Sequence, residues 1–225
     1  YLLLNNELPG VEARSILSPS RVKNAAAELR VIVSRDPFDA VLSLDNYGSR
    51  FLGPLQASAA ASLNSLLGLN EKITGQVVMA PQLGNGYELA YFMGAYEQPV
   101  GDEGTMVEFL ASFTDTDPGW TLREFDVSGQ SLYLRVKAEH PFLRSRSQNL
   151  WGRLAFDLRN QQSRNDVEIP SRRDNIRAVR VGGRYEVLDT LLGIGINSVD
   201  IELSQGLGIL GASNGGLLVS AVAVQ

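Results

Sequence analysis

The composition of this 225-residue chain excludes several classes of protein. It contains no cysteine, so it can hold neither a disulfide framework nor a thiolate metal site. Its formal net charge of −5 argues against nucleic acid as a partner, because phosphate binding needs a basic surface. Although 44% of its residues are hydrophobic, no stretch approaches the roughly 18 consecutive apolar residues of a membrane-spanning helix.

Residues 1–37 predict part of a small α+β unit. The start of the chain, from Tyr1 to Asn6, has no basic residue and too short an apolar stretch for a signal peptide. It predicts the end of a helix before a turn at Pro9-Gly10, followed by short strands at 13–17 and 28–33. Two strands and a helix end cannot bury a core, so we expect the chain to be a fragment of a longer protein rather than an exported protein that has lost its leader. Pro37 marks the boundary, because proline interrupts a β-ladder.

Residues 38–225 predict a series of antiparallel strands. Gly, Pro, Asn and Asp separate up to ten segments, which cover 38–46, 55–66, 71–80, 86–97, 105–115, 130–140, 149–160, 175–188, 197–206 and 217–224. The alanine-rich segment 55–66 could be taken for a helix, but its alternating serines favour a strand. The connections at 68–71 and 190–195 are short, whereas 115–129 and 161–174 are long and polar. This alternation of short and long connections is typical of outer-membrane barrels, which have short periplasmic turns and longer outer loops. The connection at 81–86 does not fit, because it should be an outer loop and is short.

Apolar and polar side chains alternate along these segments. Within 130–140, for example, the even positions Leu132, Leu134 and Val136 are apolar, whereas the odd positions Tyr133 and Arg135 are polar. Successive strand side chains point to opposite faces, so each strand has one apolar and one charged face. A soluble sandwich alternates too, but its strands are usually about five or six residues long. Alternating strands of about ten residues are typical of a transmembrane β-barrel.

The alternation predicts which side chains line the lumen of such a barrel and which face lipid. The lumen set carries both signs of charge: Glu88, Glu108, Arg135, Lys137, Glu139, Arg153, Asp157, Arg159, Arg180, Arg184, Glu186, Asp200 and Glu202. The lipid set is apolar: Ile73, Val77, Leu89, Val107, Phe109, Leu134, Leu154, Phe156, Val179, Val181 and Ile201. A lumen of compensating charges explains the whole charged set, whereas a pair of catalytic carboxylates would explain two of its members at most.

Two other signals for chemistry are weak. Gly206–Gly211 matches the G-x-G-x-x-G dinucleotide pattern, but an alternating strand precedes it and Asn214-Gly215-Gly216 cannot start a helix after it. A glycine-rich outer loop is the better interpretation. His140 is the only histidine and precedes Pro141, so we expect a solvated turn residue rather than a metal ligand or a catalytic base. We expect no enzyme activity and no cofactor.

Several motifs, in order, resemble two-partner secretion transporters of the haemolysin activator (ShlB/FhaC/HecB) type. The run LSLDNYGSRFLGP at 42–54, continued by SLNSLLGL at 62–69, resembles the start of that family's barrel. Further matches are REFDV at 123–127 and PFLRSRSQNL at 141–150. The segment 5–33 resembles the second half of the family's membrane-proximal POTRA domain. The resemblance spans residues 2–213.

The resemblance implies a sixteen-stranded barrel in the outer membrane of a Gram-negative bacterium, with its POTRA domains in the periplasm. Such a transporter exports a large β-helical partner protein, unfolded in transit, without ATP. On that plan the chain is all-β. About ten of sixteen strands, at 38–225, form a partial transmembrane antiparallel β-barrel, and the C-terminal part of an α+β POTRA domain precedes them at 1–37. The family's plug helix, first POTRA domain and sixth outer loop lie outside the sequence.

An open barrel edge would leave backbone groups unsatisfied in lipid, so the chain alone should not be a working pore. The run Arg180–Tyr185 lies within a strand, so it is not the inward-folding motif of the family's sixth outer loop.

The POTRA strand is the candidate contact for substrate. Its residues could pair, through their backbone, with an extended incoming chain: Leu29, Arg30, Val31, Ile32, Val33 and Ser34. Alternatively, this strand lies inside the POTRA sheet and only connects it to the barrel. The expected partners are thus a secreted exoprotein and outer-membrane lipid, but not nucleic acid. A porin-like channel and a soluble ligand-binding β-barrel are the alternative functions; the POTRA segment argues against the first, and dependence on detergent would argue against the second.

Overall fold

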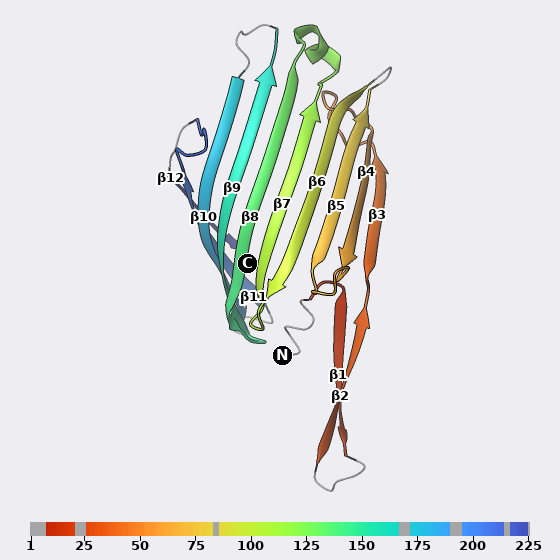
Figure 1. Cartoon of the computed structure of the whole chain (residues 1–225), viewed down its shortest axis with the longest axis vertical. Helices are drawn as coiled ribbons and strands as arrows, with labels where there is room; N and C mark the ends of the chain where they lie inside the picture. The colour runs from red at the N-terminus through yellow and green to blue at the C-terminus, as the bar shows by residue number, and fades with distance from the viewer. Residues whose placement is uncertain are drawn as a thin grey trace.

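The computed structural model describes residues 8–20, 26–82, 86–166, 172–189, 195–213 and 217–224, the last range by its backbone only. These residues form two antiparallel sheets (Figure 1). The small sheet has the order β1-β2, and the large one has ten strands in the order β12-β11-β10-β9-β8-β7-β6-β5-β4-β3. None of the helical turns in the described ranges is long and apolar enough to cross a membrane.

The small sheet is a hairpin that points away from one end of the large sheet (Figure 1). Its strands are β1 (Val11–Pro19) and β2 (Ala27–Arg35), so both predicted strands are confirmed and are longer than expected. Gly10, at φ +65°, forms its root: a Cβ there would lie 2.2 Å from the Asp36 carbonyl oxygen. Asn64 Nδ2 donates to that same oxygen at 2.9 Å, which ties the hairpin to the large sheet. The predicted helix end at 2–4 lies outside the described residues.

The large sheet contains every strand predicted for residues 38–225. Its strands join neighbours in sequence, as in a series of hairpins: β3 (Phe38–Asp45), β4 (Gln56–Asn64), β5 (Lys72–Pro81), β6 (Tyr87–Val100), β7 (Thr105–Thr116), β8 (Ser128–Arg144), β9 (Gln148–Arg164), β10 (Arg172–Asp189), β11 (Gly195–Gly206) and β12 (Leu217–Val224). The end of the sheet beside the hairpin is called the inner end here, and the opposite end the outer end. β3 and β12 form the two edges of the sheet.

One predicted loop is partly strand. The polar stretch 161–174 was expected to be a long outer loop, but Gln161 pairs with Asp174 and Ser163 with Arg172. Polar side chains are compatible with a strand whose two faces are both hydrated, so polarity alone does not distinguish a loop from a strand that extends beyond a membrane. β8 also continues past Pro141, where a shift of register before Leu143 accommodates the proline.

The cross-strand register assigns side chains to two faces. Residues directly opposite one another share a face, so the register of β6 to β11 places Glu108, Arg135, Asp157, Arg180 and Glu202 on one side, called the polar face. All but one residue of the predicted lipid set lie on the other side, the apolar face: Ile73, Val77, Val107, Phe109, Leu134, Leu154, Phe156, Val179, Val181 and Ile201.

Leu89 is the exception, and its predicted face is wrong. It pairs with Ala80 and Thr116, which lie on the polar face. The register shifts where Pro81 pairs with Tyr87, so Glu88 is an extra residue that breaks the alternation. Sequence alternation alone cannot locate such a bulge.

Burial is distributed in the opposite way from a water-soluble domain. The buried hydrophobic residues of the described ranges are all alanines, and the only large side chain that is completely buried there is Glu71. On the apolar face, Leu154 and Val181 are 55% and 52% exposed, whereas Asp157 on the polar face is 4% exposed. Soluble monomers rarely expose a contiguous apolar surface of this extent. The sheet therefore needs an apolar medium on one side.

Candidate functional site

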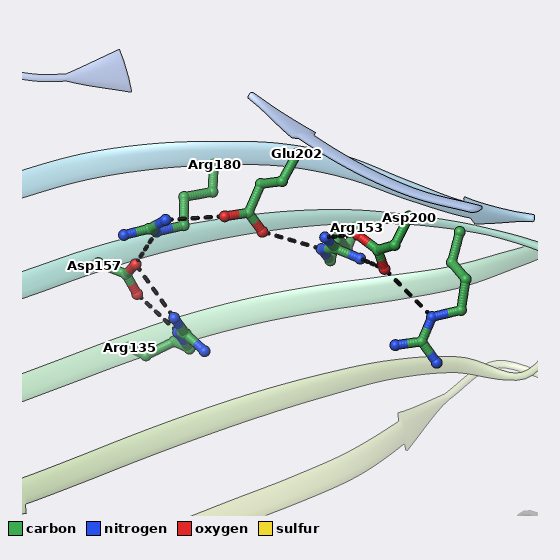
Figure 2. Close-up of polar contacts among 7 residues, drawn as sticks. Arg135, Arg153, Asp157, Arg180, Asp200 and Glu202 are labelled. Atoms are coloured by element: carbon green, nitrogen blue, oxygen red, sulfur yellow. Dashed lines mark hydrogen bonds and ion pairs between the residues drawn. The ribbon is translucent and has the colours of Figure 1, made fainter. Parts of the chain in front are cut away.

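An ion-pair network crosses the polar face from β8 to β11. Opposite charges alternate along it (Figure 2), and its members are Arg135, Asp157, Arg180, Glu202, Arg153, Asp200 and Arg184. All seven belong to the predicted lumen set. The sequence predicted that these charges share a face, and the structure shows that they are in direct contact.

Asp157 is the acceptor at one end of the network. Its Oδ1 accepts a hydrogen bond from the Tyr133 hydroxyl at 2.8 Å and one from Arg135 Nε at 2.8 Å. Its Oδ2 accepts one from Arg180 Nε. Since this carboxylate is almost fully buried, the three donors replace the water that it would bind when exposed.

Arg153 holds the other end together. Its Nη1 and Nη2 donate to the two oxygens of Asp200 at 2.7 and 2.5 Å, and its Nε donates to Glu202 Oε2 at 3.2 Å. Each of these acids has a second arginine: Arg180 Nη1 lies 2.9 Å from Glu202, and Arg184 Nε lies 3.3 Å from Asp200. Paired donors of this kind fix the geometry of both partners.

Small residues make the network possible. Gly182 lies between Arg153 and Glu202 in the cross-strand register, and Ala155 and Ala178 occupy similar positions beside Arg180 and Asp157. A Cβ on Gly182 would lie 2.8 Å from Arg153 Nε and 2.9 Å from the carbonyl oxygen of Ile201. The guanidinium of Arg153 can cross β10 only because that side chain is missing. Sequence reasoning missed Gly182 and Tyr133, although a glycine within a strand is a signal of close approach.

The other predicted lumen residues lie around this network. Lys137 Nζ contacts Glu108 at 3.1 Å, the guanidinium of Arg159 lies 5.2 Å from the ring centre of Tyr133, and Glu186 lies 3.9 Å from Arg184. Glu139 lines a cavity of about 300 Å³ at the inner end, together with Leu8, Arg144, Trp151 and Arg184. Within the described ranges no cluster of three or more His, Asp or Glu could hold a metal ion.

Glu88 lies apart from the network, at the outer end. Its carboxylate packs beside two loop glycines: a Cβ on Gly119 would lie 2.0 Å from Oε1, and one on Gly53 would lie 3.2 Å from Oε2. Arg123 Nη2 is 3.9 Å from the same carboxylate. The loop 46–55 and the 3-10 turn η1 (Trp120–Phe125) therefore meet on this residue.

Direct contacts join these two outer loops. Gly119 N–H donates to the Phe51 carbonyl oxygen at 2.8 Å, and the rings of Phe51 and Trp120 are 5.5 Å apart. The guanidinium of Arg50 lies 5.4 Å from the centre of the Trp120 ring. The family-like motifs at 42–54 and 123–127 are thus neighbours in space, which their separation in sequence did not indicate.

Glu71 closes the turn between β4 and β5. Its carboxylate accepts hydrogen bonds from the backbone N–H of Leu67 and, at 2.9 Å, from that of Leu69. The N–H of Leu67 is the main cause that holds the pKa of Glu71 below its usual range. Ser65 and Asn70 adopt φ of 57° and 58°, so the turn wraps around the carboxylate.

The candidate substrate strand lies in β2. All six predicted residues belong to this strand, and every residue of β2 is exposed. Among the described residues β2 pairs only with β1.

The two weak motifs have ordinary environments. Gly206 ends β11, and a turn follows in which Ala212 N–H donates to the Ile209 carbonyl oxygen at 3.0 Å. His140 lies within β8, where its Nδ1 is 2.8 Å from Thr105 Oγ1 and its ring packs edge-on against Phe142. The expectation that His140 is a turn residue is therefore wrong, because β8 continues past Pro141.

Comparisons with known proteins identify one family and solved structures with a similar fold. The family model described as haemolysin secretion/activation protein ShlB/FhaC/HecB matches residues 28–216. The heme/hemopexin transporter protein HuxB of Haemophilus influenzae (strain 86-028NP) is 21% identical over 182 residues, which are 81% of this chain and 32% of that protein. CdiB from Escherichia coli has a TM-score of 0.77 at 17% identity, and CdiB from Acinetobacter baumannii 0.65 at 13%. Each CdiB match covers 94% of this chain and 39% of the other, so the chain spans about a third of HuxB and about two-fifths of CdiB.

Proposed function

This chain belongs to the haemolysin secretion/activation family ShlB/FhaC/HecB, and on that premise we propose that it builds part of an outer-membrane pore that secretes a partner protein. Transporters of this family reside in the outer membrane of Gram-negative bacteria. In the proposal the apolar face contacts lipid and the polar face lines the lumen. Residues 1–37 are the C-terminal part of a periplasmic POTRA domain, residues 38–225 are the N-terminal part of the barrel, and further strands beside β3 and β12 close the barrel in the whole protein.

The inverted burial of the large sheet supports this proposal most directly. A ten-strand sheet that exposes its leucines and valines on one side, and pairs its charges on the other, suits a wall between lipid and water. A soluble ligand-binding barrel would bury its aliphatic side chains in a core instead. A porin-like channel could share this wall, so the nature of the cargo needs its own test.

The ion-pair network fits a passage for an unfolded chain. Its arginines and acids already bind one another, so each has little free capacity to hold a substrate side chain tightly. Tight binding anywhere along the path would stall transport. The network therefore stiffens the wall and offers weak, distributed polar contacts to a large exoprotein that is unfolded in transit.

We further propose that the exoprotein first pairs with β2. Strand addition draws its affinity from main-chain hydrogen bonds and tolerates many side chains, as a transporter of a whole protein requires. Successive backbone amides point to opposite edges of a strand, so Ile32→Pro and Val33→Pro remove donors from opposite edges of β2. The variant at the edge that does not face β1 should stop secretion while the barrel still assembles. If crosslinks from the partner in transit never map to 29–34, strand addition at β2 is excluded.

The central experiment uses the full-length gene product and the secreted protein that is tested as its partner. We expect the transporter in the outer-membrane fraction, ion conductance when it is reconstituted in a planar bilayer, and partner protein in the medium only when the transporter is present. Conductance without any effect on secretion would favour the porin-like alternative. Purification from an aqueous lysate without detergent would exclude the membrane proposal.

A further inference from the structure

A polar cavity interrupts the apolar face near its outer end. This rim pocket has a volume of about 390 Å³, and side chains of β8, β9 and β10 line it. Gln130, Gln162 and Arg173 lie opposite one another in one cross-strand row, and Asn160 and Asn175 lie in the next row inward. The second row continues across the sheet to Leu132 and Phe113, which are apolar. The rim pocket thus lies at the height where headgroups of a surrounding lipid leaflet would lie.

Two arginines give this region positive charge that no carboxylate of the described residues pairs with. Arg173 is exposed, and no carboxylate of the described ranges forms an ion pair with it. Arg177 is only 5% exposed, and its guanidinium donates to the carbonyl oxygens of Arg159 and Leu210, both at 3.1 Å, and to Asn160 Oδ1 at 2.8 Å. Its Nε is buried without a partner, and again no described carboxylate is paired with it. A buried cation without a counter-charge is costly, so an anion beside Asn160 would be stabilised.

An apolar groove continues from the rim pocket across the apolar face. Its volume is about 720 Å³, and Phe113 and Leu132 line both cavities. Its floor is one cross-strand row of small residues on five neighbouring strands: Ala40, Ala61, Gly75, Gly94 and Ala111. A Cβ on Gly75 or Gly94 would meet nothing within 4 Å, which shows that the groove is open space.

We propose that the rim pocket and the groove form one binding site for an anionic, phosphate-bearing lipid of the outer leaflet. The phosphate lies beside Arg173 and Asn160 in the rim pocket, an acyl chain lies in the groove, and the buried guanidinium of Arg177 adds positive charge from behind Asn160. A free phosphate would use the arginines but leave the groove empty, whereas a lipid satisfies both parts. The outer leaflet follows from position. The rim pocket is lined by residues where β9 ends and β10 begins, and these strand ends lie opposite the β1–β2 hairpin (Figure 1). The inference rests on the proposed function, since only a membrane-inserted sheet presents this face to lipid.

The test measures lipid retention by the full-length transporter, using native mass spectrometry. The probes are phosphatidylglycerol and phosphatidylcholine with identical acyl chains. We expect about tenfold tighter retention of the anionic lipid, and we expect Arg173→Gln to abolish this preference. The matched control is Arg172→Gln, which changes the neighbouring arginine that pairs with Asp174 at 3.3 Å; it should leave the preference intact. Gly94→Leu fills open space in the groove and should weaken retention of both lipids.

Three results would overturn the lipid site. They are equal retention of both probes by the unmodified protein, equal effects of Arg172→Gln and Arg173→Gln, and unchanged retention in Gly94→Leu. The same samples are inserted into planar bilayers, which separates this inference from the proposed function. Failure of the unmodified protein to insert would refute the pore, whereas insertion without lipid preference would refute the lipid site alone.

Discussion

Leu154→Arg should prevent assembly of the barrel far more strongly than loss of its neighbour Arg153. Leu154 occupies the middle of the apolar face of β9, in a cross-strand row with Ala138, Val181 and Leu203. An arginine on the lipid side near the midplane costs about 2–4 kcal/mol. Since about 1.4 kcal/mol corresponds to a factor of ten in an equilibrium constant, the equilibrium constant for folding should fall by about 30-fold to 1,000-fold.

Arg153→Ala is the matched change on the other face of the same strand. It removes three hydrogen bonds, but Glu202 keeps Arg180 and Asp200 keeps Arg184, so neither acid is left without a cation. We therefore expect a smaller loss of about 1–2 kcal/mol.

Both variants, with Leu154→Ala as a control for lost bulk, are compared in the full-length protein by urea titration of folding into lipid vesicles. The assignment of faces is refuted if Leu154→Arg folds like the unmodified protein while Arg153→Ala does not.

Three further predictions concern the network and the inner turn. Asp157→Ala should lower the free energy of unfolding by about 2–3 kcal/mol, because two partly buried arginines lose the carboxylate that they share. The same urea titration measures this loss. A loss near zero would show that the network does not stiffen the wall. Gly182→Val should displace the guanidinium of Arg153 and crowd the carbonyl of Ile201, so it should destabilise the sheet more than Gly183→Val; equal effects would contradict the close approach at Gly182. The lowered pKa of Glu71 means that its stabilising effect is present above the carboxyl's unfolded-state pKa and is lost as pH falls through the lower folded-state value. Thermal unfolding from pH 7 to pH 3 should show a smaller acid-induced fall for Glu71→Gln than for the unmodified protein, and identical profiles would exclude this role.

The sequence alone was sufficient to predict the strands and most of their faces. A β-strand has a side-chain period of two, so the alternation around Leu134 and Arg135 specifies both the strand and its two environments. It predicted all ten strands of the large sheet and both strands of the small sheet, and the order of motifs pointed to the family. The sequence also predicted that the charged residues share one face. That inference depends only on whether a residue lies at an odd or an even position of its strand, not on which residues are in contact.

Only the tertiary structure determined which of those residues meet. The contact between Arg153 and Glu202 passes over Gly182, and it depends on the register of three strands that no local pattern records. The extra residue at Glu88 reversed the expected face of Leu89, since a single inserted residue leaves the composition of a strand unchanged. The docking of the two outer loops on Glu88 likewise arises from segments distant in sequence, as does the burial of Arg177 with no ion-paired carboxylate among the described residues. Alternation is a local property of the backbone, whereas contacts across a sheet depend on how whole strands are aligned.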